Sequence, residues 1–261
     1  MHREHSPQDS NPTPTPKRQV RMVAIPGGTF LMGGGSKTKE GASYEVVLSP
    51  YWIDVTEVTI EEYMRCVDAG QCSEPSVPDT QCVKLSSGKN RPANCVSWQN
   101  AVDYCTWVGK RLPTEAEWEF AATGGENRRF PWGKAAPDDS RVHWSGNCGY
   151  VACGGAPIAV GERPSGDSPF GVADMAGNVS EWVLDWHGDY PTQRKTNPRG
   201  PEGGKRRVIR GGSWDTSTED SISTTARSRA WPQIQVAAIG FRCASSEAPE
   251  FLNDPQISDP P

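Results

Sequence analysis

The second half of the chain, beyond Gly124, contains no apolar periodicity long enough for an extended helix or strand. Short apolar runs alternate there with Gly, Pro, Asn and Asp, which predicts coil and brief strands. With 27 glycines and 23 prolines in 261 residues, breakers of regular structure recur along the chain. Ten tryptophans supply large rings that can fill a core between loops. We therefore predict an irregular fold with little regular secondary structure.

The first half carries the start signals of three short helices. Residues 59–62 and 114–117 are capping boxes of the form Thr-x-x-Glu, and Ser97 is a natural N-cap between them. Strands are predicted at residues 51–56, 207–210 and 238–243, and a short hairpin at residues 23–33. The expected fold class is α+β.

The chain is expected to form one domain, because nothing inside it resembles an interdomain linker. Residues 1–20 are polar and contain no apolar segment of a signal peptide, so we predict a disordered arm, with the domain at residues 21–246 and a disordered tail at residues 247–261. No run approaches the roughly 20 apolar residues that a membrane-spanning helix requires. We expect a monomer without a membrane span.

The charge of the chain argues against two classes of partner. The chain has 27 basic and 32 acidic residues, a formal charge of −5, and no basic block longer than residues 205–207. Nucleic acid and anionic membranes are therefore not expected as partners.

Eight cysteines, even in number and widely spaced, are typical of disulfide bonds formed in an oxidising compartment. Free thiols are the alternative, whereas a structural zinc site would need paired Cys-x2-Cys spacings, which do not occur. We therefore expect an extracytoplasmic protein, periplasmic, cell-surface or secreted, whose export signal is absent from this sequence.

Eight motifs follow one another in a fixed order, including Gly-Lys-Arg-Leu-Pro-Thr-Glu-Ala-Glu-Trp-Glu and Arg-Gly-Gly-Ser-Trp. They occupy residues 25–33, 52–59, 96–98, 109–119, 130–133, 174–182, 210–214 and 240–242. Over about residues 20–245 the chain resembles the formylglycine-generating enzyme, or sulfatase-modifying factor, family. The resemblance implies that family's fold, an irregular variant of the C-type lectin fold.

The segment from Asp174 to Glu181 supplies two carboxylates, a glycine turn and an amide, which are the hard oxygen ligands that calcium prefers. The resemblance implies a structural calcium held by the side chains of Asp174 and Glu181 and the backbone oxygens of Gly177 and Val179, with Asn178 bracing the turn. An Asx-type turn without a metal is the alternative. A second family calcium site lies upstream, where this chain has Asn147 but no matching aspartate.

The oxidase chemistry of the family is where the resemblance fails. Active members carry two cysteines, five residues apart, that bind copper(I) after the Arg-Gly-Gly-Ser motif. The equivalent residues here are Thr216 and Ser221. Neutral hydroxyls are poor ligands for a soft metal, so no copper is expected.

Several other polar side chains of the chain belong to types that serve as catalytic groups or metal ligands. Ser213, Asp215 and Glu219 are candidates for acid or base chemistry in the altered cleft, although a solvated acidic loop is the preferred interpretation. Glu115 and Glu117 are expected at a solvated, capped helix start. The four histidines cannot assemble a three-histidine iron site.

The resemblance also implies a disulfide between Cys105 and Cys243, worth about 4 kcal/mol or more in the chain-entropy model. Proximity then favours three local pairs among the remaining cysteines. These are Cys66–Cys72, Cys82–Cys95 and Cys148–Cys153.

The preferred function is an exported binding or interaction module, a pseudoenzyme of the family, for an unidentified protein, peptide or glycan. Its contacts are expected on residues 216–231 and on Trp214, Trp186 and Trp144. The alternatives are a diverged oxidoreductase or other enzyme using the same cleft and, last, a working formylglycine generator.

Overall fold

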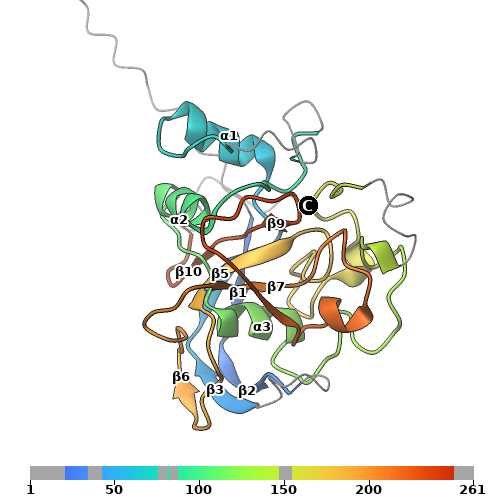
Figure 1. The fold of residues 1–261 in the computed structure, drawn as a ribbon. Helices are drawn as coiled ribbons and strands as arrows, with labels where there is room; N and C mark the ends of the chain where they lie inside the picture. The colour runs from blue at the N-terminus through green and yellow to red at the C-terminus, as the bar shows by residue number, and fades with distance from the viewer. Residues whose placement is uncertain (1–20, 35–42, 76–81, 83–87, 147–154, 250–261) are drawn as a thin grey trace, which may run out of the picture.

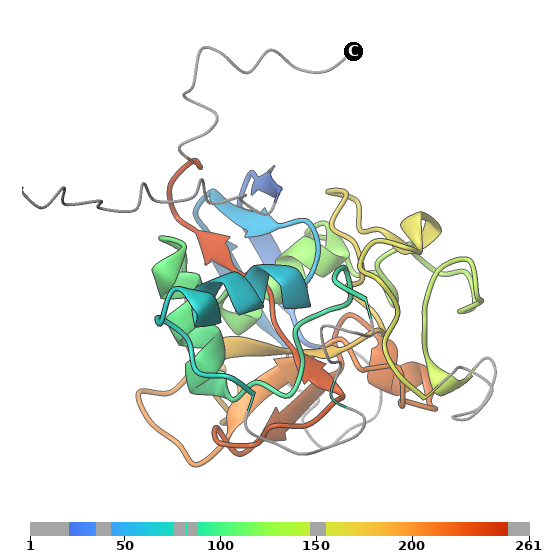
Figure 2. The ribbon, with the colours of Figure 1, turned by 90° about the horizontal axis from the view of Figure 1, so that it is seen from above.

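The structure, a computed structural model, describes residues 21–34, 43–75, 82, 88–146 and 155–249. The predicted arm at residues 1–20, most of the predicted tail, Asn147, and the predicted pair Cys148–Cys153 lie outside these residues. The described chain folds into three small sheets and three short helices, joined by long irregular loops (Figures 1 and 2). The α+β class and the low content of regular structure are confirmed.

Two of the sheets are built from the N-terminal strands. In the first, β4 (Tyr51–Asp54) pairs antiparallel with both β1 (Met22–Ile25) and β10 (Ala244–Ser245). In the second, β3 (Tyr44–Leu48) lies between β2 (Gly28–Met32) and β6 (Lys195–Thr196). Short strands from the C-terminal half thus complete sheets that begin in the N-terminal half.

The predicted hairpin at residues 23–33 is wrong, although both of its strands exist. β1 and β2 belong to different sheets and do not pair with each other. Between them Gly27 has φ +69°, and a Cβ atom there would lie 2.4 Å from the main-chain oxygen of Leu48. Close packing against the end of β3 therefore turns the chain out of the first sheet and into the second.

The third sheet has the order β8-β7-β5-β9 and contains the longest strand. β5 (Ser180–Trp186) and β7 (Arg207–Arg210) form its centre, flanked by β8 (Arg227–Ala230) and β9 (Ile239–Gly240). β7 matches the predicted strand, whereas the strand predicted at residues 238–243 is only the short β9. The chain leaves this sheet after β9 and enters the first sheet as β10.

All three predicted helix starts are confirmed. α1 (Ile60–Asp68), α2 (Trp98–Trp107) and α3 (Glu115–Thr123) begin after N-caps whose hydroxyls accept hydrogen bonds from the third helical residue. α3 ends at Gly124, which adopts the left-handed conformation with φ +69°. Local sequence is enough to place these helices because capping bonds join residues only three apart.

The central sheet is buried on both faces. Trp182 and Ile209 face a core that includes α1 and α2, whereas Val183 and Val208 face a second core that includes α3 and strands β1 to β4. In Figure 1, α1 and α2 accordingly lie above β5 and β7, and α3 lies below them. The two-residue alternation of strand side chains produces this division.

The solvated helix start predicted for α3 is wrong. All nine residues of α3 are buried, including three glutamates, because the helix packs against β2, β3, β5 and β7. Glu115 and Glu119 pair there with Arg210 and Arg227 from distant segments, and Glu117 pairs with Arg111, six residues before it.

Three disulfide bonds cross-link the described chain. They are the predicted pairs Cys105–Cys243, Cys66–Cys72 and Cys82–Cys95. The first joins α2 to the segment between β9 and β10 across 138 residues. Within the described ranges, none of the helices has the length and apolar character needed to cross a bilayer.

Candidate functional site

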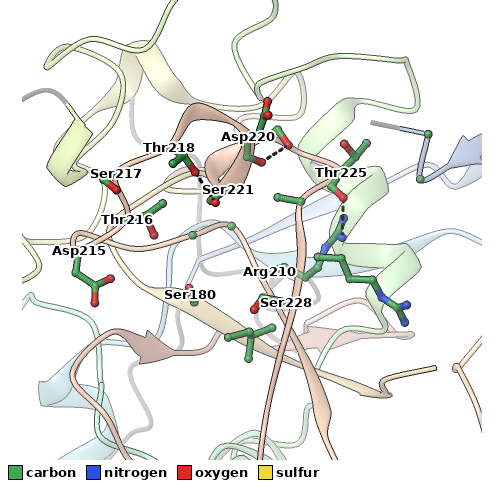
Figure 3. A pocket seen from close by; sticks show the side chains of 18 of the residues that line it. Ser180, Arg210, Asp215, Thr216, Ser217, Thr218, Asp220, Ser221, Thr225 and Ser228 are labelled. Carbon is green, nitrogen blue, oxygen red and sulfur yellow. Dashed lines mark hydrogen bonds between the residues drawn. The ribbon is translucent and has the colours of Figure 1, made fainter. Parts of the chain in front are cut away.

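A cavity of about 530 Å³ opens at one end of β5, β7 and β8. Hydroxyl groups dominate its wall, and Figure 3 shows them converging from the loop after β7, from the 3-10 helix η3 (Glu219–Ile222) and from β8. Those on the wall are Ser180, Thr216, Ser217, Thr218, Ser221, Ser223, Thr225 and Ser228. A wall of this composition can donate and accept hydrogen bonds at many points but holds few charges.

Two glycines shape the loop that enters the cavity. Gly211 and Gly212 have φ +90° and +68°, and a Cβ atom on Gly212 would lie 2.8 Å from the main-chain oxygen of Ser221. This close approach brings η3 back against the end of β7. The local sequence Arg-Gly-Gly-Ser therefore builds the cavity through the backbone.

Thr216 and Ser221 both line this cavity (Figure 3). The Thr216 hydroxyl bonds to the main-chain N–H of Ser213 at 3.0 Å, and the Ser221 hydroxyl lies 2.7 Å from that of Thr218. Both hydroxyls thus belong to a local polar network. Neither position offers a sulfur ligand.

The three candidate acid and base residues are Ser213, Asp215 and Glu219, and they do not all lie together in the structure. The Ser213 hydroxyl donates to Asp215 at 2.5 Å. Asp215 is exposed and lines the cavity. Glu219 instead forms an ion pair with Arg129 at 3.0 Å. The cavity wall contains no histidine among the described residues, and His143 bonds through Nε2 to Ala156 O.

A buried ionic network supports the cavity from below. The Arg210 guanidinium lies 2.5 Å from Glu119 and 3.4 Å from Glu115, and Arg227 lies 2.8 Å from Glu115. The Tyr190 hydroxyl also donates to Glu115 at 3.1 Å. Because these side chains come from α3, β7, β8 and a loop, the network fixes four segments around the cavity.

Asp185 on β5 joins this network at the start of α3. Its Oδ2 accepts a hydrogen bond from the Glu115 main-chain N–H at 2.8 Å. Burial, followed by the negative charge of Glu115, raises the pKa of Asp185 to about 8. The region beneath the cavity therefore holds more carboxyl groups than its two arginines neutralise.

A second buried cluster surrounds the predicted calcium segment. Asp174 accepts a hydrogen bond from Gly161 N–H through Oδ2 at 2.6 Å. Glu181 is 0% exposed, and its two oxygens bind Arg242 at 2.7 and 2.8 Å. The Trp118 indole donates to the same carboxylate at 2.9 Å. Asp174 and Glu181 are thus both buried, but Glu181 is already paired with a cation.

Glu57 belongs to this cluster and was missed from the sequence. It is 0% exposed, and its Oε1 accepts a bond from Asn178 at 3.0 Å, whereas Oε2 has no partner. Burial, followed by the charge of Asp174, holds the pKa of Glu57 well above its usual range. The only sequence signal was an acidic residue between the apolar residues Val55 and Val58.

These oxygens fit a hard cation in part. Glu57 offers an unpartnered buried oxygen beside Asp174, and three carboxylates surround one guanidinium, so a divalent cation would balance the excess negative charge. Within the described ranges, no three Asp, Glu, His or Cys side chains are already arranged to hold a metal. This agrees with the pairing of Glu181 to Arg242.

The aromatic residues predicted to contact a ligand are mostly in the core. Trp214 and Trp144 are 1% and 5% exposed, because they pack under the loops, so the prediction for them is wrong. Trp186 is half-buried against Arg207. Trp231, at the end of the predicted segment, is 42% exposed.

Comparison with known proteins confirms the family resemblance. The profile of the sulfatase-modifying factor enzyme 1-like domain matches residues 8–247. A formylglycine-generating enzyme from Thermomonospora curvata is 34% identical, over 86% of this chain and 93% of the relative. An inactive C-alpha-formylglycine-generating enzyme 2 from Mus musculus is 31% identical, over 86% of this chain and 85% of the relative.

Solved structures lead to the same fold. PvdO from Pseudomonas aeruginosa superimposes with a TM-score of 0.72 at 27% identity, covering 87% of this chain and 95% of that protein. The similarity therefore extends through the whole domain.

Proposed function

This chain belongs to the sulfatase-modifying factor enzyme 1-like family, and we propose that it is a member without copper oxidase activity that works as a binding module. The observation that carries the proposal is the presence of Thr216 and Ser221 on the cavity wall, at the positions of the family's copper cysteines. Both hydroxyls are bonded to neighbouring polar groups, and neither can replace a thiolate. The similarity to an inactive mouse relative supports the same conclusion.

The hydroxyl-lined cavity is the proposed ligand site. Its wall suits a polar ligand, a protein, peptide or glycan, because each Ser or Thr can serve as a donor or an acceptor. The buried network beneath it supplies rigidity, which reduces the entropy lost on binding.

A diverged enzyme is the second candidate function. The short hydrogen bond from Ser213 to Asp215 on the cavity wall is the observation that favours it. If the cavity catalyses a reaction in which Asp215 acts as an acid or a base, Asp215→Asn should abolish turnover of the substrate. The affinity of the protein for that substrate should stay within about threefold.

We also propose a structural calcium ion at the second buried cluster. Glu57 and Asp174 would provide side-chain oxygens, and Gly177 and Val179 backbone oxygens, while Glu181 orients Arg242 beside them. Titration calorimetry with calcium should show binding, and Glu57→Gln should weaken it at least about tenfold. Glu162→Gln, a change at a glutamate outside the cluster, serves as the control.

The three disulfides support an extracytoplasmic location, because such bonds persist in oxidising compartments. Intact-mass analysis of protein produced in the native host, before and after reduction, would test this. Alkylated free thiols at Cys105 and Cys243 would contradict it.

Copper(I) binding and peptide turnover test whether the protein is an oxidase. We expect no stoichiometric copper(I) binding and no conversion of a peptide containing Cys-x-Pro-x-Arg. The double variant Thr216→Cys/Ser221→Cys should gain copper(I) affinity, because two thiolates then face the same cavity. Thr192→Cys/Asn197→Cys has the same spacing in an exposed segment outside the cavity and should not. Copper-dependent turnover by the unmodified protein would overturn the proposal.

A further inference from the structure

Strand β8 forms the outer edge of the central sheet, and its first residues line the cavity. It is the terminal strand in the order β8-β7-β5-β9, and within the described residues its main-chain hydrogen bonds run to β7 alone. Ala226, Arg227 and Ser228 lie on the cavity wall. Figure 3 shows Ser228 of β8 among the other residues that line the cavity. An unpaired strand edge can accept a further strand from another chain.

One face of this edge carries an exposed arginine next to an exposed aromatic ring. Arg229 and Trp231 are two residues apart, so their side chains lie on the same side at an interval of roughly 6.8 Å, whereas the side chain of Arg227, two residues earlier, is buried and paired with Glu115. Arg206, the residue before β7, has its guanidinium 5.0 Å from the centroid of the Trp231 ring. Arg229, Arg206 and Trp231 therefore form one patch at the end of β8 that lies away from the cavity.

The patch formed by Arg229, Arg206 and Trp231 is basic in an acidic protein. Lys205 directly precedes Arg206 in the chain, whereas the whole chain has a formal charge of −5. Lys205 and Arg229 are exposed, and Trp231 is 42% exposed. A positive patch with one apolar ring is complementary to an acidic partner with an apolar side chain.

We propose that β8 binds an extended, acidic segment of a partner protein by strand addition. An acidic side chain would face Arg229, and an apolar side chain two residues along would pack on Trp231, beside the positive charge of Arg206. This inference rests on the proposed function, because it names the partner class of the same binding module.

Three physical reasons favour an extended peptide over other anions. An extended peptide has the same two-residue period as β8, so an acidic side chain opposite Arg229 and an apolar side chain opposite Trp231 would lie on one face of the peptide. The edge supplies main-chain hydrogen bonds, which a polysaccharide cannot use in this pattern. Trp and Arg are also the residue types that most often dominate binding energy at protein interfaces.

The test uses a labelled twelve-residue peptide with Glu at alternate positions, Thr between them and one Leu near the end. Fluorescence anisotropy should show saturable binding, and an isomer with the glutamates in one block should bind at least about tenfold more weakly. Two further peptides carry N-methyl groups on one or the other set of alternate amides. Only one set can face β8, so one of the two should lose binding and the other should keep it.

Protein variants test the position of the site. Arg206→Glu and Arg229→Glu should each weaken binding at least about tenfold, and Trp231→Ala at least about threefold. Arg65→Glu makes the same charge change on α1, where Arg65 pairs only with Glu61 among the described residues, and should leave the affinity unchanged. Equal thermal midpoints would show that the variants remain folded.

Other occupants would give different results. A sulfated polysaccharide such as heparin that binds equally well, with no effect of peptide alternation or N-methylation, would overturn the inference in favour of a general anion surface. A dimer dissociated by Arg229→Glu would show that a second copy covers β8, and would overturn it too. Absence of peptide binding, together with absence of copper turnover, would remove this inference and leave the loss of oxidase activity standing.

Discussion

The two ends of strand β7 accommodate an arginine in opposite ways. At the cavity end, the Arg210 side chain is 0% exposed and pairs with Glu119 at 2.5 Å and Glu115 at 3.4 Å. At the other end, Arg207 has no carboxylate partner within the described residues. Its guanidinium lies 3.6 Å from the centroid of the Trp98 ring and 3.5 Å from the centroid of the Trp186 ring. One charge is balanced by opposite charges and the other by the faces of aromatic rings.

Because of this difference, the stability of the two ends of β7 should depend on pH in different ways. The cavity end contains several buried carboxyl groups, so its stability changes with protonation. The opposite end contains indoles, which do not titrate, and burial lowers the pKa of Arg207 only to about 10. Changes of pH near neutrality should therefore act on the cavity end first.

The largest effect is expected from Arg210→Met. Removing the guanidinium leaves Glu119 buried without its cation and Glu115 with Arg227 alone, which should reduce the free energy of unfolding by about 3–5 kcal/mol. Urea denaturation of the variant measures this change. A loss below about 1 kcal/mol would mean that the two ends of β7 do not differ as described.

Next, when compared per pH unit, is the pH dependence caused by Asp185. Its pKa is raised to about 8, so between about pH 4 and pH 8 the folded state retains a proton that the unfolded state releases. Stability should therefore fall as pH rises through this window, by up to about 1.4 kcal/mol per pH unit. In Asp185→Asn the slope of unfolding free energy against pH should be shallower, and an unchanged slope would contradict the assignment.

A smaller effect is expected from Arg207→Met. The variant loses the stacking on Trp98 and Trp186 and a hydrogen bond to Leu184 O, but it uncovers no buried carboxylate, so a loss of about 1–2 kcal/mol is expected. Arg207→Lys keeps the charge without the planar group and should recover only part of the loss. A loss as large as that of Arg210→Met would break the comparison.

The smallest effect on stability is expected from Trp231→Ala. The ring is 42% exposed and contacts the Arg206 guanidinium, so its removal should cost less than about 1 kcal/mol. The same variant is expected to weaken peptide binding. Thermal unfolding and anisotropy on one protein sample would separate the two roles of this residue.

Local signals were enough to predict the helices and the strand β7. Thr59, Ser97 and Thr114 act as N-caps through contacts three residues away, so the sequence around them contains the necessary information. The pairing of β1 and β2 with other strands depends on Gly27 packing against the end of β3, which no local pattern encodes.

The errors in the site have the same cause. Glu115 was expected in solvent because its cations, Arg210 and Arg227, lie 95 and 112 residues away in the chain. Glu57 was missed because its contact with Asn178 spans 121 residues. Charged residues in a short helix are exposed by default, and only the tertiary fold shows which of them are paired in the core.

The buried position of Asn178 has a consequence for producing the protein. Asn178-Val179-Ser180 is the only Asn-x-Ser/Thr acceptor for N-linked glycosylation in the chain whose middle residue is not proline. Asn178 is 1% exposed, and its amide bonds to Glu57 and to the main-chain N–H of Ile158. A glycan added during synthesis would have no room in the folded core. Expression in a host that lacks this modification, or with Ser180→Ala, therefore avoids a species that cannot fold.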